Sequence, residues 1–280
     1  MRPSTGSSAD PREGGNGLPR LRSRVLLAAA MAVLAIAVMS ATAVGVLSGR
    51  SAAAAVPRQG RSVAAPRPAA LAADPRTSCT AVAHIGDSTS VGMVSPQWLP
   101  DAAQRLAAQY RGVGVQREWI DASGGRSVVE ELPGQQNGYR IASAWYGAGF
   151  RGCWVIALGT NDAANVAAGS GVSMMARVRQ MMAAVHGEPV LWVNAQTGLA
   201  SGPWSEANMQ QWNETLVQAS ERYPNMRIFN WAGMVQPGWH LADGIHYTSA
   251  GYAIRAAAIA HALASAFPAH GHSNTVVVSN

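Results

Sequence analysis

The sequence contains no lysine, and all 21 residues of its basic count are arginine. The absence of lysine excludes Schiff-base chemistry, a Ser-Lys dyad and the lysine of a phosphate-binding loop. The arginines are also unevenly distributed: residues 1–79 hold 10 arginines and 3 acidic residues, whereas residues 80–280 hold 11 and 12. Because a nucleic-acid-binding domain concentrates basic residues on its folded part, we predict no nucleic-acid partner.

Cysteine is scarce as well, since the chain has only Cys79 and Cys153. One disulfide between them would suit a domain exported to an oxidising compartment. Closing a loop of this size would stabilise the fold by roughly 4 kcal/mol. We favour the disulfide, and two buried free thiols are the alternative.

Residues 25–48 form a long stretch without charge that follows Arg20, Arg22 and Arg24. At 1.5 Å per residue such a helix spans about 36 Å, enough for a bilayer core of about 30 Å. We predict a single-pass transmembrane signal-anchor, with residues 1–24 as a disordered cytoplasmic tail and the bulk of the chain outside the cell membrane. A cleaved signal peptide, whose apolar region usually has about 7 to 15 residues, is the alternative and would make the protein secreted.

After this stretch the composition changes twice. Residues 49–78 are rich in Ala, Pro and Arg, which predicts a disordered linker. From residue 79 onward, strand-like and helical segments alternate, a pattern typical of a parallel sheet with helices on both faces. We predict an α/β fold, a three-layer flavodoxin-like domain over residues 79–268 with a five-stranded parallel sheet, and a flexible tail at 269–280. Strands are expected at 80–85, 115–120, 153–158, 189–194 and 227–230, and helices near 101–110, 172–185, 206–222 and 250–266.

The loops that follow the predicted strands carry the polar motifs. They contain GDS at 86–88, DASGGRS at 121–127, GTND at 159–162 and HLADGIHYTSAGY at 240–252. In open α/β sheets, sites form beyond the carboxyl ends of the strands. Each motif alone is common, but their arrival at one edge of the sheet predicts a single site.

Acyl transfer needs the residue types that these loops supply. A serine hydroxyl is a weak nucleophile until an imidazole takes its proton, and a carboxylate must hold that imidazole in the right tautomer. Asp243 and His246 are three residues apart, so one turn can join them and leave the other ring nitrogen facing Ser88. The backbone N–H groups of Ser88 and Gly125 and the side-chain amide of Asn161 can bind the oxyanion.

The four motifs resemble, in order and approximate spacing, the blocks of the SGNH or GDSL-type serine hydrolases, over about residues 81–267. We predict a site without cofactor or metal, because no Cys, His or Glu cluster elsewhere in the sequence offers further ligands. In the second block it favours Gly125 over Gly124, because family members often carry Asp-Ala-x-x-Gly-Arg there. The implied roles are nucleophile for Ser88, general base for His246, orienting acid for Asp243, and oxyanion hole for Ser88, Gly125 and Asn161.

Each assignment has a simpler alternative. Ser88 could be a helix N-cap or a turn residue, Asn161 a turn former, and Asp243 with His246 a cap for the last helix. His240, Asp243 and His246, at three-residue steps, would also suit zinc. The G-x-S-x-G elbow of the α/β-hydrolases is not matched, because GDSTS lacks the second glycine.

These observations predict a membrane-anchored, extracytoplasmic serine esterase that removes small acetyl-type groups from cell-envelope carbohydrate or glycolipid. The ester chemistry follows from the motifs, and the substrate from the resemblance and the predicted location. One alternative is an O-acyltransferase that uses the same triad with a separate membrane acyl-donor protein, and another is a non-catalytic glycan-binding module. Trp98, Trp204 and Trp239 lie in or near the site loops, where an aromatic face can stack on a sugar ring.

Overall fold

The computed structural model describes residues 76–279. The predicted cytoplasmic tail at 1–24, the transmembrane segment at 25–48 and nearly all of the linker at 49–78 lie outside these residues. Within residues 76–279, no helix is long and apolar enough to cross a membrane. The domain already includes Thr77, whose backbone N–H donates to the carbonyl of Val113 at 2.9 Å.

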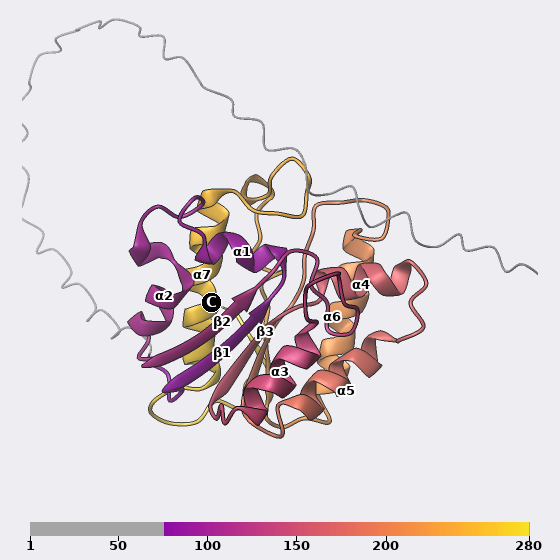
Figure 1. The fold of residues 1–280 in the computed structure, drawn as a ribbon. Coiled ribbons are helices and arrows are strands. Elements are labelled where there is room, and N and C mark those ends of the chain that lie inside the picture. The colour runs from indigo at the N-terminus through magenta and orange to yellow at the C-terminus, as the bar shows by residue number, and fades with distance from the viewer. Residues whose placement is uncertain (1–75, 280) are drawn as a thin grey trace, which may run out of the picture. The chain divides into compact units, whose positions relative to one another are not determined.

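A parallel sheet of six strands, in the order β2-β1-β3-β4-β5-β6, forms the middle layer of this region (Figure 1). The strands are β1 (Ala81–Gly86), β2 (Arg117–Ala122), β3 (Cys153–Ala157), β4 (Val190–Val193), β5 (Met226–Phe229) and β6 (Val277–Val278). The first five lie within two residues of their predicted positions. The order of these five is that of a flavodoxin-like sheet, so the α/β prediction is confirmed.

The sixth strand corrects the prediction of a five-stranded sheet. β6 falls in the segment 269–280, which we expected to be a flexible tail, and it pairs with β5 through Ile228 opposite Val277 and Phe229 opposite Val278. Val278 is buried against the core, whereas Val277 is exposed. A strand of two residues is too short to show the alternation that identifies strands in a sequence. Its position therefore depends on pairing with β5.

Helices cover both faces of the sheet (Figure 1). One face carries α1 (Ser88–Val94), α2 (Leu106–Gly112) and α7 (Ser249–Ala266), and the other carries α3 (Gly138–Gly147), α4 (Thr160–Ala167), α5 (Met174–Ala184) and α6 (Glu206–Ser220). Two 3-10 turns, η1 (Ala102–Gln104) and η2 (Pro237–Trp239), lie in the connections. The sequence pattern does not predict α1, α3 or α4, because these helices are short and contain Gly, Ser, Thr or Asn, which are weak helix formers.

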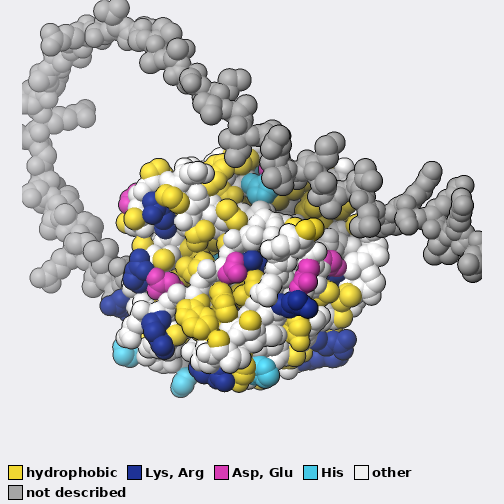
Figure 2. Space-filling model, viewed as in Figure 1, with side chains coloured by type: hydrophobic (Ala, Val, Ile, Leu, Met, Phe, Trp, Pro, Cys, Tyr) yellow, Lys and Arg dark blue, Asp and Glu magenta, His cyan; other side chains and the backbone are white. Residues whose placement is uncertain are grey.

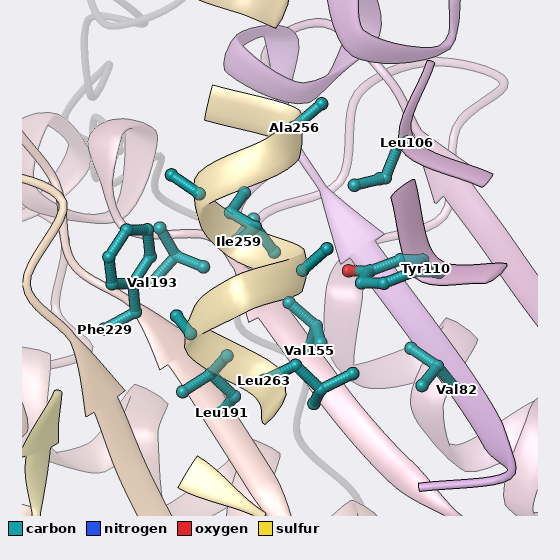
Figure 3. Packing of buried hydrophobic residues seen from close by; sticks show 14 of the residues in the cluster. Val82, Leu106, Tyr110, Val155, Leu191, Val193, Phe229, Ala256, Ile259 and Leu263 are labelled. Carbon is teal, nitrogen blue, oxygen red and sulfur yellow. The ribbon is translucent and has the colours of Figure 1, made fainter. Parts of the chain in front are cut away.

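The core on the α7 face shows why the last helix lies close to the sheet. Small alanines alternate with larger side chains along α7, and Ile259 and Leu263 point at Val155 and Leu191 of the central strands (Figure 3). Tyr110 of α2 closes the same cluster and is fully buried. The helix begins at Ser249, three residues after His246 of the predicted Asp-x-x-His segment.

Cys79 and Cys153 form a disulfide, as predicted, with 5.7 Å between their Cα atoms. It joins the start of β1 to the start of β3, two neighbouring strands, at the end of the sheet away from the predicted site. On the outside, acidic and basic side chains are interspersed over the face drawn in Figure 2. This mixture agrees with the nearly neutral composition of residues 80–280.

Candidate active site

Three of the four predicted site loops leave the sheet side by side. Gly86 at the end of β1 is the register partner of Ala122 at the end of β2 and of Ala157 at the end of β3. The GDS, DASGGRS and GTND segments therefore start from one row of residues. The parallel topology brings them together although they are far apart in the sequence.

Ser88 is the first residue of α1 and is partly buried. Its neighbour Asp87 is the N-cap: Oδ1 of Asp87 accepts hydrogen bonds from the backbone N–H of Thr89 at 2.8 Å and from the Thr89 hydroxyl at 2.7 Å. The capping role that we considered for Ser88 thus belongs to Asp87. Within the described residues the Ser88 hydroxyl has no hydrogen-bond partner, so it is free to serve as a nucleophile.

His84 lies beneath this turn and is not a second candidate for the general base. Its Nδ1 lies 2.8 Å from the hydroxyl of Tyr110, and its Nε2 lies 3.2 Å from Oγ of Ser90. Burial, followed by the charge of Arg255, lowers the pKa of His84 to about 3. The ring is therefore neutral and has a packing role. Gly86 makes room for the contact between His84 and Ser90, because a Cβ at residue 86 would lie 2.3 Å from Oγ of Ser90 and 3.1 Å from Nε2 of His84.

The second loop is held by an arginine that the sequence analysis did not single out. Nη1 of Arg126 donates to the carbonyls of Asp121 at 2.9 Å and Gly86 at 3.1 Å, and Nη2 donates to Oδ1 of Asp121 at 2.8 Å. Arg126 is buried and so fixes the loop to the ends of β1 and β2. Gly125 has a φ of 71°, a conformation that favours glycine. Gly124 has no such requirement.

Asn161, in the first turn of α4, is held from two sides. Its Nδ2 donates to the carbonyl of Arg126 at 3.0 Å, and its Oδ1 accepts from the indole N–H of Trp204 at 3.3 Å. An amide nitrogen carries two hydrogens, so one N–H of Asn161 remains for an oxyanion. The first of these bonds also joins the asparagine directly to the Gly125 loop.

Asp243 and His246 form the hydrogen bond that the sequence predicts, with 2.7 Å between Oδ2 of Asp243 and Nδ1 of His246. Oδ1 of the same carboxylate accepts the backbone N–H groups of Ile245 and His246, both at 2.9 Å. Partial burial acts to raise the pKa of Asp243, but the hydrogen bonds from His246 and Ile245 outweigh it and hold the pKa below its usual value. The carboxylate is therefore ionised at neutral pH and leaves Nε2 of His246 to act as a base.

Contacts on the α7 side connect the serine and histidine segments. The hydroxyl of Tyr252, at the start of α7, donates to the carbonyl of Ser88 at 3.5 Å. Burial raises the pKa of Asp87, while hydrogen bonds from Thr89 and the charges of Arg255 and His246 act to lower it. The acid–base pair is formed, and Tyr252, six residues after His246, links its segment to the turn that carries the serine. A hydrogen bond between the Ser88 hydroxyl and His246 is not present, and such contacts often form only with substrate.

His240, the third member of the alternative zinc set, is used differently. Its Nε2 lies 2.6 Å from Oε1 of Gln196, and its ring stacks on Tyr247 with 4.8 Å between centroids. Residues 76–279 hold no group of three or more His, Cys, Asp or Glu side chains arranged to bind a metal ion. His246 meanwhile directs its Nδ1 to Asp243. The three side chains do not converge on a common point.

A buried ion-pair cluster behind the site was also missed from the sequence. Arg177 of α5 is fully buried and pairs with Glu130 and, at 3.1 Å, with Asp162, the neighbour of Asn161. Burial raises the pKa of Asp162 to about 7, although Arg177 and the backbone N–H of Val128 act to lower it. Partial burial acts to raise the pKa of Glu130, but hydrogen bonds, of which that from Arg177 has the largest effect, lower this pKa to about 2. Of these three residues, only Asp162 lies in a motif that the sequence points to, GTND, and the motif does not indicate an ion pair.

Several solved structures are similar to this chain in fold. The lipase/acylhydrolase from Enterococcus faecalis is 14% identical, with a TM-score of 0.50 over 68% of this chain and 98% of that chain. Est24, a carbohydrate acetylesterase from Sinorhizobium meliloti, is 16% identical, with a TM-score of 0.50 over 67% and 99%. The C-terminal catalytic domain of the Streptococcus pneumoniae peptidoglycan O-acetyltransferase OatA is 15% identical, with a TM-score of 0.48 over 68% and 97%. At these identities the similarity concerns the fold alone.

No curated protein sequence matches the chain significantly. The sequence model of the GDSL-like Lipase/Acylhydrolase family matches residues 84–254, from β1 into α7. This range covers more than half of the chain and contains every residue of the predicted triad and oxyanion hole. The chain belongs to the GDSL-like lipase/acylhydrolase family, as the sequence motifs predict, and is an ester-hydrolysing enzyme.

Proposed function

We propose that the protein is a serine esterase of the cell envelope that removes small acetyl-type groups from carbohydrate or glycolipid. Ser88 is the nucleophile, His246 the general base and Asp243 the acid that orients it. The observation that supports this assignment is the 2.7 Å bond between Nδ1 of His246 and Oδ2 of Asp243, in a segment that Tyr252 links to Ser88. That bond fixes the imidazole tautomer that a serine nucleophile needs.

In the acylation step, Nε2 of His246 takes the proton from the Ser88 hydroxyl while Oγ attacks the ester carbonyl carbon. The C–O bond of the ester then breaks, the alcohol leaves with the proton from His246, and the acyl group remains on Ser88. Asp243 stabilises the imidazolium that exists between these events. Its lowered pKa suits this role, because the carboxylate must stay ionised while the imidazole is charged.

The tetrahedral intermediate requires hydrogen-bond donors for its negatively charged oxygen. We assign this role to the backbone N–H of Ser88, the backbone N–H of Gly125 and the free N–H of the Asn161 amide, each expected to contribute about a hundredfold or more in rate. Arg126 supports two of these donors. Its guanidinium holds the loop that contains Gly125, and its backbone carbonyl accepts a hydrogen bond from the Asn161 amide. Water then attacks the acyl-enzyme, with His246 as the base, and releases the acid.

The substrate class and the location rest on further arguments. Residues 25–48 are long and apolar enough to anchor the chain, and the basic residues before them favour an extracytoplasmic enzyme domain. The disulfide between Cys79 and Cys153 suits such a compartment. Est24, which has the same fold, is named a carbohydrate acetylesterase. An acylated carbohydrate or lipid of the cell envelope would be within reach of a domain anchored in this way.

The test uses the full chain in detergent. A fluorophosphonate probe is expected to label Ser88, and Ser88→Ala is expected to lose both the labelling and the hydrolysis of p-nitrophenyl acetate. A Ser88→Ala variant with full esterase activity would refute the assignment. Acetate, butyrate and octanoate esters then measure the acyl preference, for which we expect acetate to be the best substrate.

The same assay separates hydrolysis from O-acyl transfer. With an oligosaccharide acceptor present, an esterase releases acetate at an unchanged rate and the acceptor stays unmodified. Acetylated acceptor in the product mixture would instead favour the transferase alternative and point to a membrane acyl-donor partner. Glycan binding without turnover in every ester assay would favour the non-catalytic alternative.

A further inference from the structure

Among the loops that follow β1 to β5 in the described part of the chain, the loop between β4 and α6, residues 194–205, is the one that the proposed mechanism does not use. It nevertheless touches both halves of the site. The backbone N–H of Gly198 donates to the carbonyl of Gly244 at 2.7 Å, within the turn that carries Asp243 and His246. At its other end, the indole N–H of Trp204 donates to Oδ1 of Asn161. The loop therefore connects the acid–base turn to the oxyanion residue.

We propose that Trp204 positions the Asn161 amide and forms the surface on which a sugar ring of the substrate lies. This inference rests on the proposed function and adds the alcohol part of the substrate to it. The positioning argument comes from hydrogen-bond direction. An indole N–H only donates and the carbonyl of Arg126 only accepts, so the two bonds of Asn161 are satisfied together in one orientation of its amide. Without Trp204, the Oδ1 side loses its partner.

Trp204 is held in place well enough for this role. Its carbonyl accepts the hydroxyl of Thr197 at 2.7 Å, and the backbone N–H of Thr197 donates to Oε2 of Glu206 at 2.9 Å. Nδ2 of Asn208 donates to the carbonyl of Pro203, beside Trp204, at 2.9 Å. These bonds tie the loop to the first turn of α6 and so fix the backbone that carries the indole.

The exposure of Trp204 points to the class of ligand. Trp154, Trp192, Trp212 and Trp231 are fully buried, whereas Trp204 is 36% exposed. The acid–base pair is also open, with 35% of the His246 side chain and 46% of the Asp243 side chain exposed. A long acyl chain needs an enclosed apolar pocket. An exposed indole on an open, polar rim instead suits a sugar ring, which places its C–H face on the aromatic ring and its hydroxyls toward polar groups.

Two substitutions separate the two roles. Trp204→Phe keeps an aromatic face but loses the N–H, and we expect kcat to fall about tenfold on both p-nitrophenyl acetate and an acetylated xylo-oligosaccharide, with KM nearly unchanged. Trp204→Leu also loses the face, and we expect KM for the oligosaccharide alone to rise about fivefold. Trp119→Phe and Trp119→Leu are matched controls, because Trp119 is 37% exposed and lies on β2 against Trp145 and Phe150.

A double-mutant cycle tests whether Trp204 acts through Asn161. If it does, Trp204→Phe has no further effect on kcat in an Asn161→Ala background. Equal effects of Trp204→Phe in both backgrounds would overturn the positioning role, and unchanged oligosaccharide KM in Trp204→Leu would overturn the sugar-binding role. A wild-type chain that neither binds the fluorophosphonate nor hydrolyses esters would refute the proposed function instead, so the two failures are distinguishable.

Discussion

The carboxylate of Asp243 offers the sharpest test of the proposed triad, because two substitutions remove different parts of it. Oδ1 of Asp243 holds the turn through the N–H groups of Ile245 and His246, and Oδ2 binds the imidazole. In Asp243→Asn the remaining oxygen can keep the turn, but an NH2 group replaces the oxygen that accepts Nδ1–H. Asp243→Ala loses both functions. Asparagine thus removes the charge and the correct tautomer while the fold of the turn is kept.

The expected loss follows from the type of bond and its exposure. A hydrogen bond to a charged group contributes about 1.5–3 kcal/mol, which corresponds to about 10- to 150-fold in rate. Losses near ten-thousandfold are found where the corresponding aspartate is buried. Asp243 is 46% exposed and His246 35% exposed, so water can replace part of the lost interaction. We therefore expect Asp243→Asn to lower kcat/KM by about 10- to 150-fold.

The assay is the second-order rate of fluorophosphonate labelling, which reports activation of Ser88 without depending on deacylation, together with p-nitrophenyl acetate hydrolysis. Asp101→Asn is a suitable control, because Asp101 is exposed and also caps a turn, through the N–H of Ala103 at 2.9 Å. Thermal unfolding of all variants checks the fold. Labelling of Asp243→Asn at the wild-type rate would show that the carboxylate does not orient His246, and the triad would be refuted.

Three further predictions concern the oxyanion loop, the buried ion pair and the disulfide. Gly125→Ala places a side chain at a φ of 71° and a Cβ 2.7 Å from Cδ1 of Leu132, so we expect the unfolding free energy to fall by about 1–2 kcal/mol and most esterase activity to be lost. Gly124→Ala should stay near wild type, and equal effects of the two substitutions would contradict the choice of Gly125. The pKa of Glu130 is lowered to about 2, so the stabilisation that the ionised carboxylate gives the fold is present above pH 4.5 and is lost as the pH falls toward 2. The difference in unfolding free energy between wild type and Glu130→Gln should therefore shrink over that range, and a constant difference would contradict a stabilising role of the ion pair. Replacing Cys79 and Cys153 by serine should lower the unfolding free energy by roughly 4 kcal/mol, measured in denaturant, with no further change on adding reductant.

The sequence predicts which segments meet at one edge of the sheet, because their positions follow from topology. Once the strands are recognised, a parallel sheet must bring the residues after β1, β2 and β3 to one edge, and the spacing of Asp243 and His246 allows only a local turn. Both expectations depend on contacts along the chain or on strand order. The Asp243–His246 bond and the neighbouring loop ends were predictable for this reason.

The supporting residues could not be predicted, because their roles depend on long-range contacts. Arg126 ends the Asp-Ala-x-x-Gly-Arg motif, but the motif does not show that this arginine bonds to the end of β1, 40 residues away. Arg177 and Glu130 are 47 residues apart and meet only after α5 packs on the sheet. Trp204 bonds to Asn161 across 43 residues. Each of these contacts needs the folded arrangement of helices, and no periodicity in the sequence records it.

The environments of Asp87 and Asp243 agree with a proposed triad whose acid is distant in sequence from the proposed nucleophile. Asp87 is adjacent to Ser88, but burial raises its pKa and its Oδ1 is occupied by Thr89. Asp243 is half exposed, and hydrogen bonds from His246 and the turn lower its pKa. A carboxylate that must stabilise an imidazolium has to stay ionised at the working pH, and two acids whose pKa values are moved in opposite directions divide such tasks. Asp87 is therefore suited to holding the helix start that presents Ser88, and Asp243 to supplying the charge.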